Sequence, residues 1–385
     1  MRAVHILKIT AIAGAESHLL LLLAGLRQRG VDARFLVMVE PTRPMDNFMD
    51  AAAQRGIPAE RHIIRHHTDV TLHPRIWRRL RSLKPDIVHT HLQHGDLYGI
   101  PAAWLARVPV VITSRHNNDP RRQWKSLQFV NRTLWRLVDA GICISDANKA
   151  FSIAVEDAPA DRLHTIHYGL ELPQAKIDRP SARQTLRREL GAGDNALLIG
   201  MVCRLIEIKG IPYTLRAFHR IANAFPDARL VIAGEGPLRE SIEAEAKALG
   251  IADRVHLLGW RDDIPRLMAA YDVLVVSSFR EGFGLVMLEA MAQQIPVIGT
   301  NVSAIPEVIV DGETGRLVPP GDIDALADVL GQILADNALR QHMGFLGEDR
   351  LETHFSASRM VDETIALYRR LLSDKGRQGE TSNDS

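Results

Sequence analysis

The chain has 385 residues, a formal net charge of +1, 46% hydrophobic residues and 24% charged residues. These values resemble those of soluble globular proteins and exclude a collagen-like or largely disordered chain. The length exceeds that of one ordinary hydrophobic core, so we expect two domains.

The cysteines and the longest apolar run indicate the compartment. Cys143 and Cys203 are the only cysteines, and their surroundings lack the spacing of a disulfide framework or a zinc site. The leucine-rich stretch 19–26 is too short to span a membrane, and no basic region or cleavage site marks a signal peptide. We expect a soluble or peripheral protein, located in the cytoplasm or at the inner face of the cell membrane.

The first half of the chain alternates predicted strands with predicted helices. The strands are expected at residues 3–9, 31–39, 86–92, 108–116 and 140–145, and the helices at 16–29, 76–85 and 97–107. Continuous apolar strands separated by helices are typical of a parallel sheet that is covered on both faces. This pattern predicts a doubly wound domain over residues 1–172.

The second half repeats this order after a change in composition. Residues 173–195 are polar and contain Pro and Gly, which predicts a linker. Further strands are expected at 196–205, 228–236, 254–260, 273–278 and 295–300, with helices at 211–224 and 238–249. A second doubly wound domain would therefore cover residues 196–356. Because ligands bind beyond the carboxyl ends of such strands, we expect the two domains to face each other across a cleft.

The C-terminal segment divides into two parts. Residues 357–372 have the periodicity of a helix, which we expect to pack back on the N-terminal domain. The composition of residues 373–385 cannot form a packed core, so we predict a disordered tail there.

The segment REGFGLVMLEAM places Glu281 and Glu289 eight positions apart around Phe283 and its flanking glycines. Glycines and a helix N-terminus suit a bound anion, whereas two acids would repel a diphosphate. Eight residues of helix span about 12 Å, so one acid could hold a sugar's hydroxyls and the other a ribose's. Alternatively, Glu281 only interacts with a helix dipole and Glu289 is solvated.

Two cations follow the strand that opens the second domain. Arg204 and Lys209 could neutralise a leaving diphosphate there, although an ordinary exposed loop explains them as well. The segment Gly234 to Pro237 lacks the third glycine of a dinucleotide fingerprint, which argues against a dehydrogenase. Asp322 and Asp324 stand at a helix start, where capping is the simpler role.

Together these motifs resemble a known family. The segment GAE at 14–16, Arg204 with Lys209, GEGP at 234–237, and Glu281 with Glu289 are similar to the motifs of the family 4 retaining glycosyltransferases of GT-B fold. The resemblance extends to about residue 370. Departures occur at Ala13, where the family has a paired glycine, and at Tyr168-Gly169, where Asn-Gly is common.

The resemblance implies an acceptor-binding N-terminal domain and a donor-binding C-terminal domain. Arg204 and Lys209 match the cations that bind the diphosphate, Glu281 matches the acid at the donor sugar, and Glu289 matches the acid at the ribose. The catalytic set implied is Glu281, His116, Arg204 and Lys209, with His116 beside the reacting sugar. The donor-binding set adds the phosphate contacts Gly14, Phe283, Gly284 and Leu285, the segment of Gly234 and Glu235, Arg261 near the base, and Glu289.

The resemblance further implies transfer from a nucleotide-diphosphate sugar, with a UDP-sugar as the expected co-substrate. The acceptor hydroxyl would attack an oxocarbenium-like centre from the leaving-group side, with retention of configuration and without a metal or other cofactor. The expected acceptor is a lipid-linked saccharide or a cell-envelope polysaccharide precursor. The alternative is a nucleotide-sugar 2-epimerase on the same architecture. A glycoside hydrolase would need carboxyl groups about 5–9.5 Å apart, closer than we expect for Glu281 and Glu289.

Residues 61–136 contain fourteen Lys and Arg against four Asp, an excess of ten positive charges. Segment 72–83 predicts an amphipathic helix that either binds anionic lipid or packs its apolar stripe on the sheet. Segment 121–137 sets Trp124, Phe129 and Trp135 among cations, which favours an anionic membrane or a lipid-linked acceptor. No signature of nucleic-acid binding accompanies these charges.

His89, His91 and His94 form a further group in the segment HTHLQH. Alternate residues of a strand share one face, which places His89 and His91 together. We interpret the group as a strand end that lines the cleft, with His91 or His94 near the acceptor, and we keep a metal site as the alternative.

Overall fold

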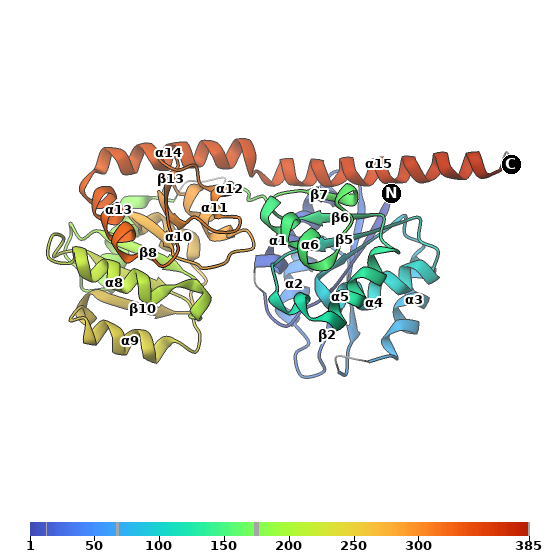
Figure 1. The fold of residues 1–385 in the computed structure, drawn as a ribbon, viewed down its shortest axis with the longest axis horizontal. Coiled ribbons are helices and arrows are strands. Elements are labelled where there is room, and N and C mark those ends of the chain that lie inside the picture. The colour runs from blue at the N-terminus through green and yellow to red at the C-terminus, as the bar shows by residue number, and fades with distance from the viewer. Residues whose placement is uncertain (13, 67–68, 173–176, 384–385) are drawn as a thin grey trace. The chain divides into compact units, whose positions relative to one another are not determined.

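The computed structural model describes residues 1–12, 14–66, 69–172 and 177–383, which form two compact units (Figure 1). The first unit comprises Met1–Gly169 and Ala357–Ser385, and the second comprises Leu170–Ser356. Ala13, residues 173–176 of the predicted linker and residues 384–385 of the predicted tail lie outside the described residues.

The first unit is built from strand and helix in alternation. Its strands are β1 (Arg2–Lys8), β2 (Asp32–Val39), β3 (Ala59–Ile63), β4 (Ile87–His91), β5 (Val110–Arg115), β6 (Ala140–Cys143) and β7 (Leu163–Thr165). Its helices are α1 (Gly14–Gln28), α2 (Asp46–Gln54), α3 (Leu72–Leu83), α4 (Leu92–Leu105), α5 (Lys125–Trp135), α6 (Asp146–Glu156) and α15 (Ala357–Asn383). The strands pair in parallel in the order β3-β2-β1-β4-β5-β6-β7.

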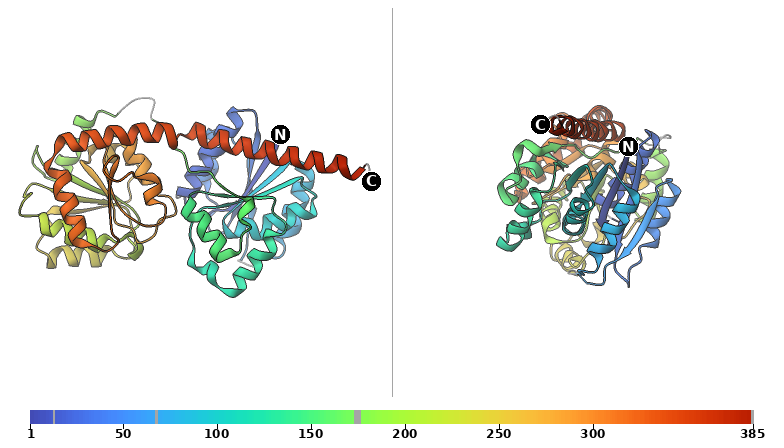
Figure 2. Two further views of the ribbon diagram at one scale, coloured as in Figure 1. Left: turned by 45° about the horizontal axis from the view of Figure 1, so that its top comes forward. Right: turned by 90° about the vertical axis from the view of Figure 1, so that its right-hand side faces the viewer.

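Both faces of this sheet are buried, as the apolar strands predict. In β1, Ala3 and Leu7 join one hydrophobic cluster with α1 and α15, whereas Val4 and Ile6 join another with α3 and α4. This division follows from the two-residue period of a strand, which sends successive side chains to opposite faces. Figure 2 shows helices on both sides of the sheet.

The second unit repeats this architecture. Its strands are β8 (Leu198–Val202), β9 (Arg229–Ala233), β10 (Val255–Gly259), β11 (Val273–Val276), β12 (Val297–Thr300) and β13 (Gly315–Val318), in the parallel order β10-β9-β8-β11-β12-β13. Its helices are α7 (Arg179–Glu189), α8 (Ile211–Ile221), α9 (Arg239–Ala248), α10 (Ile264–Ala270), α11 (Leu285–Met291), α12 (Ile305–Val308), α13 (Ile323–Ala335) and α14 (Asn337–His354).

Each sheet has one point where the order of the strands reverses direction. In the first sheet β1 pairs with both β2 and β4, and in the second β8 pairs with both β9 and β11. Such a switch point leaves a crevice beyond the carboxyl ends of the two strands, where doubly wound proteins bind their ligands. The functional residues are therefore expected after β1 and β4 and after β8 and β11.

Helix α7 lies in the segment 173–195 that the sequence predicts to be a linker. It has a proline in its first turn, and its buried residues Ala182 and Leu186 stand four positions apart. With so few apolar residues, its periodicity is hard to distinguish from that of a polar loop. Helix α7 packs on α10, so this part of the segment belongs to the second unit. The predicted strands also omitted β3, β7 and β13, which are only three to five residues long.

Helix α15 packs on the first unit through Met360, Val361, Ile365, Leu367 and Tyr368, which join the same cluster as α1. The sequence predicts disorder from residue 373, but the structure extends this helix to Asn383. Lys375 forms an ion pair with Asp139 at 2.7 Å, which ties the turn after the apolar part of the helix to the first unit.

Candidate active site

Lys209 and Glu281 meet at the switch point of the second sheet. Lys209 ends a short 3-10 helix (Glu207–Lys209) after β8, and Glu281 lies in the loop between β11 and α11. The Lys209 ammonium donates to Glu281 Oε2 at 2.5 Å, and the Ser278 hydroxyl lies 3.3 Å from the same oxygen. The side chains of Lys209 and Glu281 are 18% and 15% exposed, so a ligand can still reach the pair.

The backbone behind Lys209 is held by the end of β11. The Ser277 hydroxyl donates toward the carbonyl oxygens of Lys209 and Gly210, at 3.0 and 3.1 Å, and accepts from the Thr214 hydroxyl at 2.9 Å. Gly210 has a φ of +64°, and a Cβ added there would stand 2.1 Å from the Ser277 carbonyl oxygen. Only glycine therefore fits this turn. Sequence reasoning missed Ser277 and Ser278, although hydroxyls directly after a buried strand could have indicated them.

Gly284 forms the N-cap of α11, with a φ of +87°. A Cβ added at Gly284 would stand 2.6 Å from Met287 Cε and 3.2 Å from Glu281 Cγ, so this glycine allows the close approach of Glu281. Phe283 is buried edge-to-face against Phe355, which fixes the loop. Helix α11 begins at Leu285, and the first N–H groups of a helix have no partner within the helix.

Glu289 lies on α11, but Glu281 precedes this helix. The prediction of eight helical residues between the two acids is therefore wrong, because α11 begins only at Leu285. Gly284, with its positive φ, takes a non-helical conformation directly before the helix. Glu289 is partly buried, and this burial raises the pKa of its carboxyl.

The other predicted donor residues of this unit divide into two groups. Arg204 and Glu235 are exposed, and they follow β8 and β9. The Glu235 carbonyl accepts from the Leu205 N–H at 2.9 Å, and the Gly234 N–H donates to the Gly259 carbonyl at 2.8 Å. These backbone bonds bring the loops after β8, β9 and β10 together, at the same edge of the sheet as Lys209.

The side chain of Arg261, in contrast, is engaged elsewhere. Its guanidinium donates to both carboxylate oxygens of Asp263, at 2.7 and 2.8 Å, and to Glu189 on α7 at 2.6 Å. These hydrogen bonds raise the pKa of Arg261. With its guanidinium committed to two acids, Arg261 has only its backbone to offer a base.

In the first unit, Gly14 is exposed at the start of α1, directly after the β1 loop. His116 follows β5 and is buried, with 7% of its surface exposed. Its Nδ1 is 2.6 Å from the Tyr168 hydroxyl, and its Nε2 is 3.0 Å from His91 Nδ1. The structure thus links two predicted residues, His116 and His91, to Tyr168.

These contacts belong to a longer buried chain of hydrogen bonds. His91 Nε2 is 2.9 Å from His5 Nδ1, and His5 Nε2 is 3.3 Å from the Tyr368 hydroxyl on α15. The same hydroxyl is 2.7 Å from His89 Nδ1, and His89 Nε2 is 2.7 Å from the Ser114 hydroxyl. We call this series the histidine chain: Tyr168, His116, His91, His5, Tyr368, His89 and Ser114.

Neutral imidazoles satisfy every bond of the histidine chain. Each neutral ring donates through one nitrogen and accepts through the other, so all the bonds can point in one direction along the chain. Burial lowers the pKa of His5 and of His116 to about 3, and the charges of Arg122 and Arg115 also lower that of His116. Burial lowers the pKa of His89 and His91 as well.

A metal site is the alternative that the sequence left open for this group. Ring nitrogens of His5, His89 and His91 do lie within 4.8 Å of one another. The hydrogen bonds of the histidine chain already use both nitrogens of each ring, and all three residues are fully buried. The group is therefore explained as a hydrogen-bonded chain. His5 escaped the sequence analysis, although a histidine inside an apolar strand was a signal.

The basic segments of the first unit differ from each other. On α3, Leu72, Ile76, Leu80 and Leu83 are buried, so the apolar stripe of this helix packs on the sheet. Around α5, Trp124 is 61% exposed and Phe129 is 73% exposed, whereas Trp135 is buried beneath the Arg115 guanidinium. No helix within the described residues has the length and apolar character to cross a membrane.

Asp322 caps α13, where its side chain accepts from the Ala325 N–H at 2.9 Å. The capping role predicted for this residue is confirmed.

Comparison with known proteins places these features in a family. The model described as "Glycosyl transferases group 1" matches residues 182–349, and that described as "Glycosyltransferase Family 4" matches residues 12–173. The uncharacterized glycosyltransferase MJ1607 of Methanocaldococcus jannaschii is 30% identical over 307 residues, which are 76% of this chain and 77% of that protein. Phosphatidyl-myo-inositol mannosyltransferase of Mycobacterium leprae is 26% identical over 360 residues, 92% of each chain.

A solved structure shows the same fold. The Anabaena protein Alr3699/HepE, crystallised with UDP and glucose, superimposes with a TM-score of 0.84 at 22% identity, over 96% of this chain and all of that one. Its likeness agrees with the two parallel sheets and their strand orders. The chain therefore belongs to the family 4, group 1 glycosyltransferases and has the GT-B fold.

Proposed function

We propose that this glycosyltransferase moves a sugar from a nucleotide-diphosphate sugar to an acceptor hydroxyl, with retention of anomeric configuration and without a metal. The observation that carries the proposal is the pair of Lys209 and Glu281 at the switch point between β8 and β11. UDP is the proposed nucleotide, since a protein of the same fold was crystallised with UDP and glucose.

Lys209 has the position and charge to hold the diphosphate. In the structure its ammonium is paired with the Glu281 carboxylate at 2.5 Å. A diphosphate that approaches β8 would compete with Glu281 for Lys209, since oxygen anions bind an ammonium through the same charge-assisted hydrogen bonds. Glu281 would then turn its free oxygen to the hydroxyls of the donor sugar. The exposed Arg204 on the same loop supplies a second positive charge.

In the proposed reaction the bond between the anomeric carbon and the diphosphate oxygen breaks. The acceptor oxygen bonds to the same carbon on the side that the diphosphate leaves, and the acceptor proton passes to the departing diphosphate. Lys209, Arg204 and the N–H groups at the start of α11 stabilise the negative charge that develops there. His116 is proposed to lie beside the sugar as a neutral imidazole, in keeping with the low pKa that burial gives it. Because its two ring nitrogens contact Tyr168 and His91, a hydrogen bond to a sugar hydroxyl would replace one of these two bonds.

Substitution of the paired residues tests the proposal. Lys209→Ala and Glu281→Ala should each lower transfer by about a hundredfold or more, because each removes a charged contact to the diphosphate or sugar. The matched control is Arg239→Ala, which breaks an exposed ion pair with Glu243 in the same unit and should leave turnover unchanged. Wild-type turnover in either active-site variant would refute the assignment.

The donor and the stereochemistry need separate measurements. Thermal shifts with UDP-, GDP- and ADP-sugars should single out the UDP-sugar, and Lys209→Ala should abolish that shift. The anomeric proton coupling in the product, followed by NMR, should report the configuration of the donor. Activity should survive EDTA. An inverted product would disprove retention, and a 2-epimer formed from UDP-GlcNAc without acceptor would favour an epimerase.

We further propose that the acceptor is lipid-linked and that α5 meets the membrane. The support is the exposed pair Trp124 and Phe129, which flank Lys125 and precede Arg132. Exposed aromatic rings among cations suit the interface of an anionic bilayer. Trp124→Ser with Phe129→Ser should abolish flotation with anionic liposomes, whereas Trp260→Ser, at another exposed tryptophan, should not. Wild-type protein that fails to float would exclude this contact.

A further inference from the structure

We propose that the second unit carries a separate binding site for a phosphoryl group, at the amino ends of its strands. The site is a cavity of about 800 Å³ that is lined by four arginines: Arg179, Arg183, Arg187 and Arg340. Asp272, which directly precedes β11, also lines it. Because Lys209 and Glu281 follow the carboxyl ends of β8 and β11, this cavity lies at the opposite edge of the sheet.

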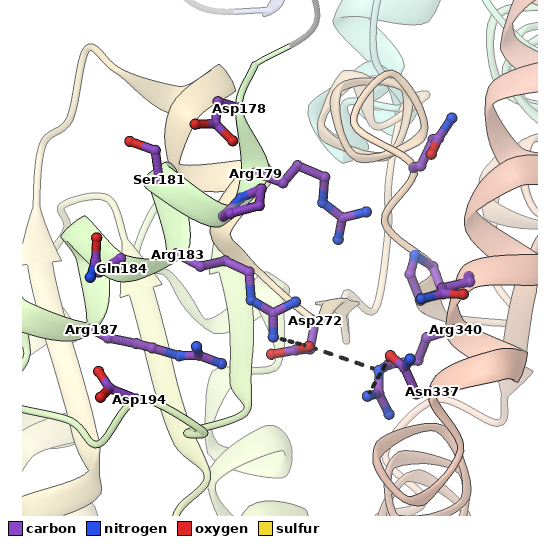
Figure 3. Close-up of a pocket in the computed structure, with 14 residues that line it drawn as sticks. Asp178, Arg179, Ser181, Arg183, Gln184, Arg187, Asp194, Asp272, Asn337 and Arg340 are labelled. Carbon is purple, nitrogen blue, oxygen red and sulfur yellow. Dashed lines mark hydrogen bonds and ion pairs between the residues drawn. The ribbon is translucent and has the colours of Figure 1, made fainter.

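Three of the arginines form one row on α7. Arg179, Arg183 and Arg187 are spaced by four residues, so their side chains leave the same side of the helix, next to the buried residues Ala182 and Leu186. Figure 3 shows the three side chains extending from α7 into the pocket, with Arg340 on the other side and Asp272 between them. The Cα atoms of successive arginines in this row lie about 6 Å apart along the helix axis, which is the rise of four helical residues.

The single buried acid does not neutralise this row. Asp272 is 2% exposed, accepts from the Leu198 N–H at 2.8 Å and from Arg183 at 2.6 Å, and lies 3.8 Å from Arg340. Arg187 and Arg340 donate to backbone carbonyls. The Arg179 Nε donates to the Ala269 carbonyl at 3.3 Å, which leaves the two terminal nitrogens of its guanidinium directed at the cavity.

Two further acids, Asp178 and Asp194, line the rim and are exposed. The lining therefore holds four positive and three negative side chains, but its interior holds the four guanidinium groups with one carboxylate. Burial and the charge of Arg183 both lower the pKa of Arg179, Arg187 and Arg340. An anion bound among these groups would relieve their mutual repulsion.

The geometry favours a compact, multiply charged ligand. A guanidinium presents a planar fork of N–H donors that fits phosphate oxygens bidentately, and neighbouring arginines of the row can share one phosphoryl group. Ser181, Gln184, Asn337 and Gln341 add polar groups to the wall, and the volume suits a phosphorylated metabolite or a lipid headgroup. Phosphoryl chemistry is common to both sources.

Binding of inorganic pyrophosphate to the full-length protein, measured by calorimetry at low ionic strength, tests the site. Arg179→Gln should weaken binding by about tenfold or more, since it removes a charge-assisted contact. Gln184→Glu, which places a negative charge on the exposed wall without disturbing a buried contact, should also weaken it. The control Arg188→Gln changes the net charge equally on the same helix, outside the lining, and should bind as wild type does.

Two comparisons separate this site from the donor site and identify the source of the ligand. Lys209→Ala should retain the binding that Arg179→Gln loses. Vesicles of phosphatidylglycerol, with phosphatidylcholine as control, test a headgroup in the same variants, and either pyrophosphate or vesicle binding that depends on Arg179 supports the site. The proposal fails if neither binds, if Lys209→Ala rather than Arg179→Gln removes binding, or if Arg179→Gln and Arg188→Gln behave alike.

Discussion

Gly210 and Ser277 help to determine the position of Lys209, in addition to the contacts of its own side chain. Gly210, which follows it, adopts a φ of +64°, and its Cα faces the Ser277 carbonyl so closely that a Cβ would stand 2.1 Å from the oxygen. The Ser277 hydroxyl holds the carbonyls of Lys209 and Gly210. Ser277 thus fixes the backbone from which the Lys209 side chain extends, and Glu281 holds its ammonium.

Gly210→Ala should therefore damage both stability and transfer. Gly191 offers a matched control, because its φ is +61° and nothing lies within 4 Å of an added Cβ. Gly191→Ala should cost only the strain of the left-handed backbone, about 1 kcal/mol. Gly210→Ala should lower the free energy of unfolding, measured in urea, by more than Gly191→Ala does. It should also lower turnover at least tenfold, because the turn must move away from Ser277 and carry Lys209 with it. Equal effects of the two substitutions would contradict this explanation.

A second pair of residues tests the histidine chain. Tyr368 and Tyr271 are both fully buried, but the Tyr368 hydroxyl joins His5 and His89, whereas that of Tyr271 has no hydrogen-bond partner among the described residues. Tyr368→Phe should destabilise the first unit by about 1–3 kcal/mol, because it leaves buried imidazole nitrogens without a partner. Tyr271→Phe should be neutral or stabilising. Calorimetry measures the stability of both variants. A Tyr368→Phe variant as stable as the wild type would refute the role of Tyr368 in the histidine chain.

For single residues, the sequence predicts the chemical groups of the site better than it predicts which side chains contact one another. Lys209 and Glu281 were predicted separately, as a cation and an acid of one site, and no spacing could show that they pair directly. Arg261 matches its motif, but its guanidinium is held by Asp263 and by Glu189 on a helix that was not predicted. The hydrogen bonds of the histidine chain could not be predicted, because His5, His89, His116 and Tyr368 come from four separate parts of the sequence.

Among the elements, α7 and the end of α15 show why polar helices are hard to predict: the sequence predicts a linker and a disordered tail at these positions. The strands β1 and β2, which have long apolar runs, were predicted to within one residue at each end, because burial on both faces demands such runs. The strand predicted at 196–205 contains β8 but extends beyond it at both ends. Helix α7 buries only Ala182 and Leu186, and the polar end of α15 continues past its last apolar residues. Periodicity reports buried faces, so a helix that buries little gives a weak signal.

The histidine chain also makes the first unit sensitive to acid. Its imidazoles are neutral in the folded state because burial lowers the pKa, to about 3 for His5 and His116, while unfolded histidines titrate near pH 6.5. The unfolded state therefore binds more protons below pH 6.5. The stability that these groups contribute is fully present above pH 6.5 and is lost as the pH falls from there towards 3.

The free energy of unfolding of the first unit should thus decrease between pH 6.5 and 5. Each buried histidine should contribute about 1.4 kcal/mol per pH unit to the slope. His5→Gln should reduce the slope by the contribution of one histidine, although it also weakens the hydrogen bonds of the histidine chain. Denaturant unfolding at several pH values measures the slope, and equal slopes in wild type and His5→Gln would contradict the prediction.

Across the whole molecule, the two units differ in how the chain enters them. The second is one continuous segment, Leu170–Ser356, whereas the first combines Met1–Gly169 with the last helix. That helix supplies Tyr368 to the histidine chain and Val361 to a close contact with Gly25 of α1, where an added Cβ would stand 2.5 Å from Val361 Cγ2. The first unit is therefore incomplete without α15.

This discontinuity reverses the usual sequence of events on the ribosome, where domains generally fold as they emerge, the N-terminal one first. Residues 1–169 leave the exit tunnel early, but the surface that α15 will cover stays open until α15 has been synthesised. The second unit can reach its final form meanwhile. The unit that begins to be made first is thus completed only after the second unit has been made.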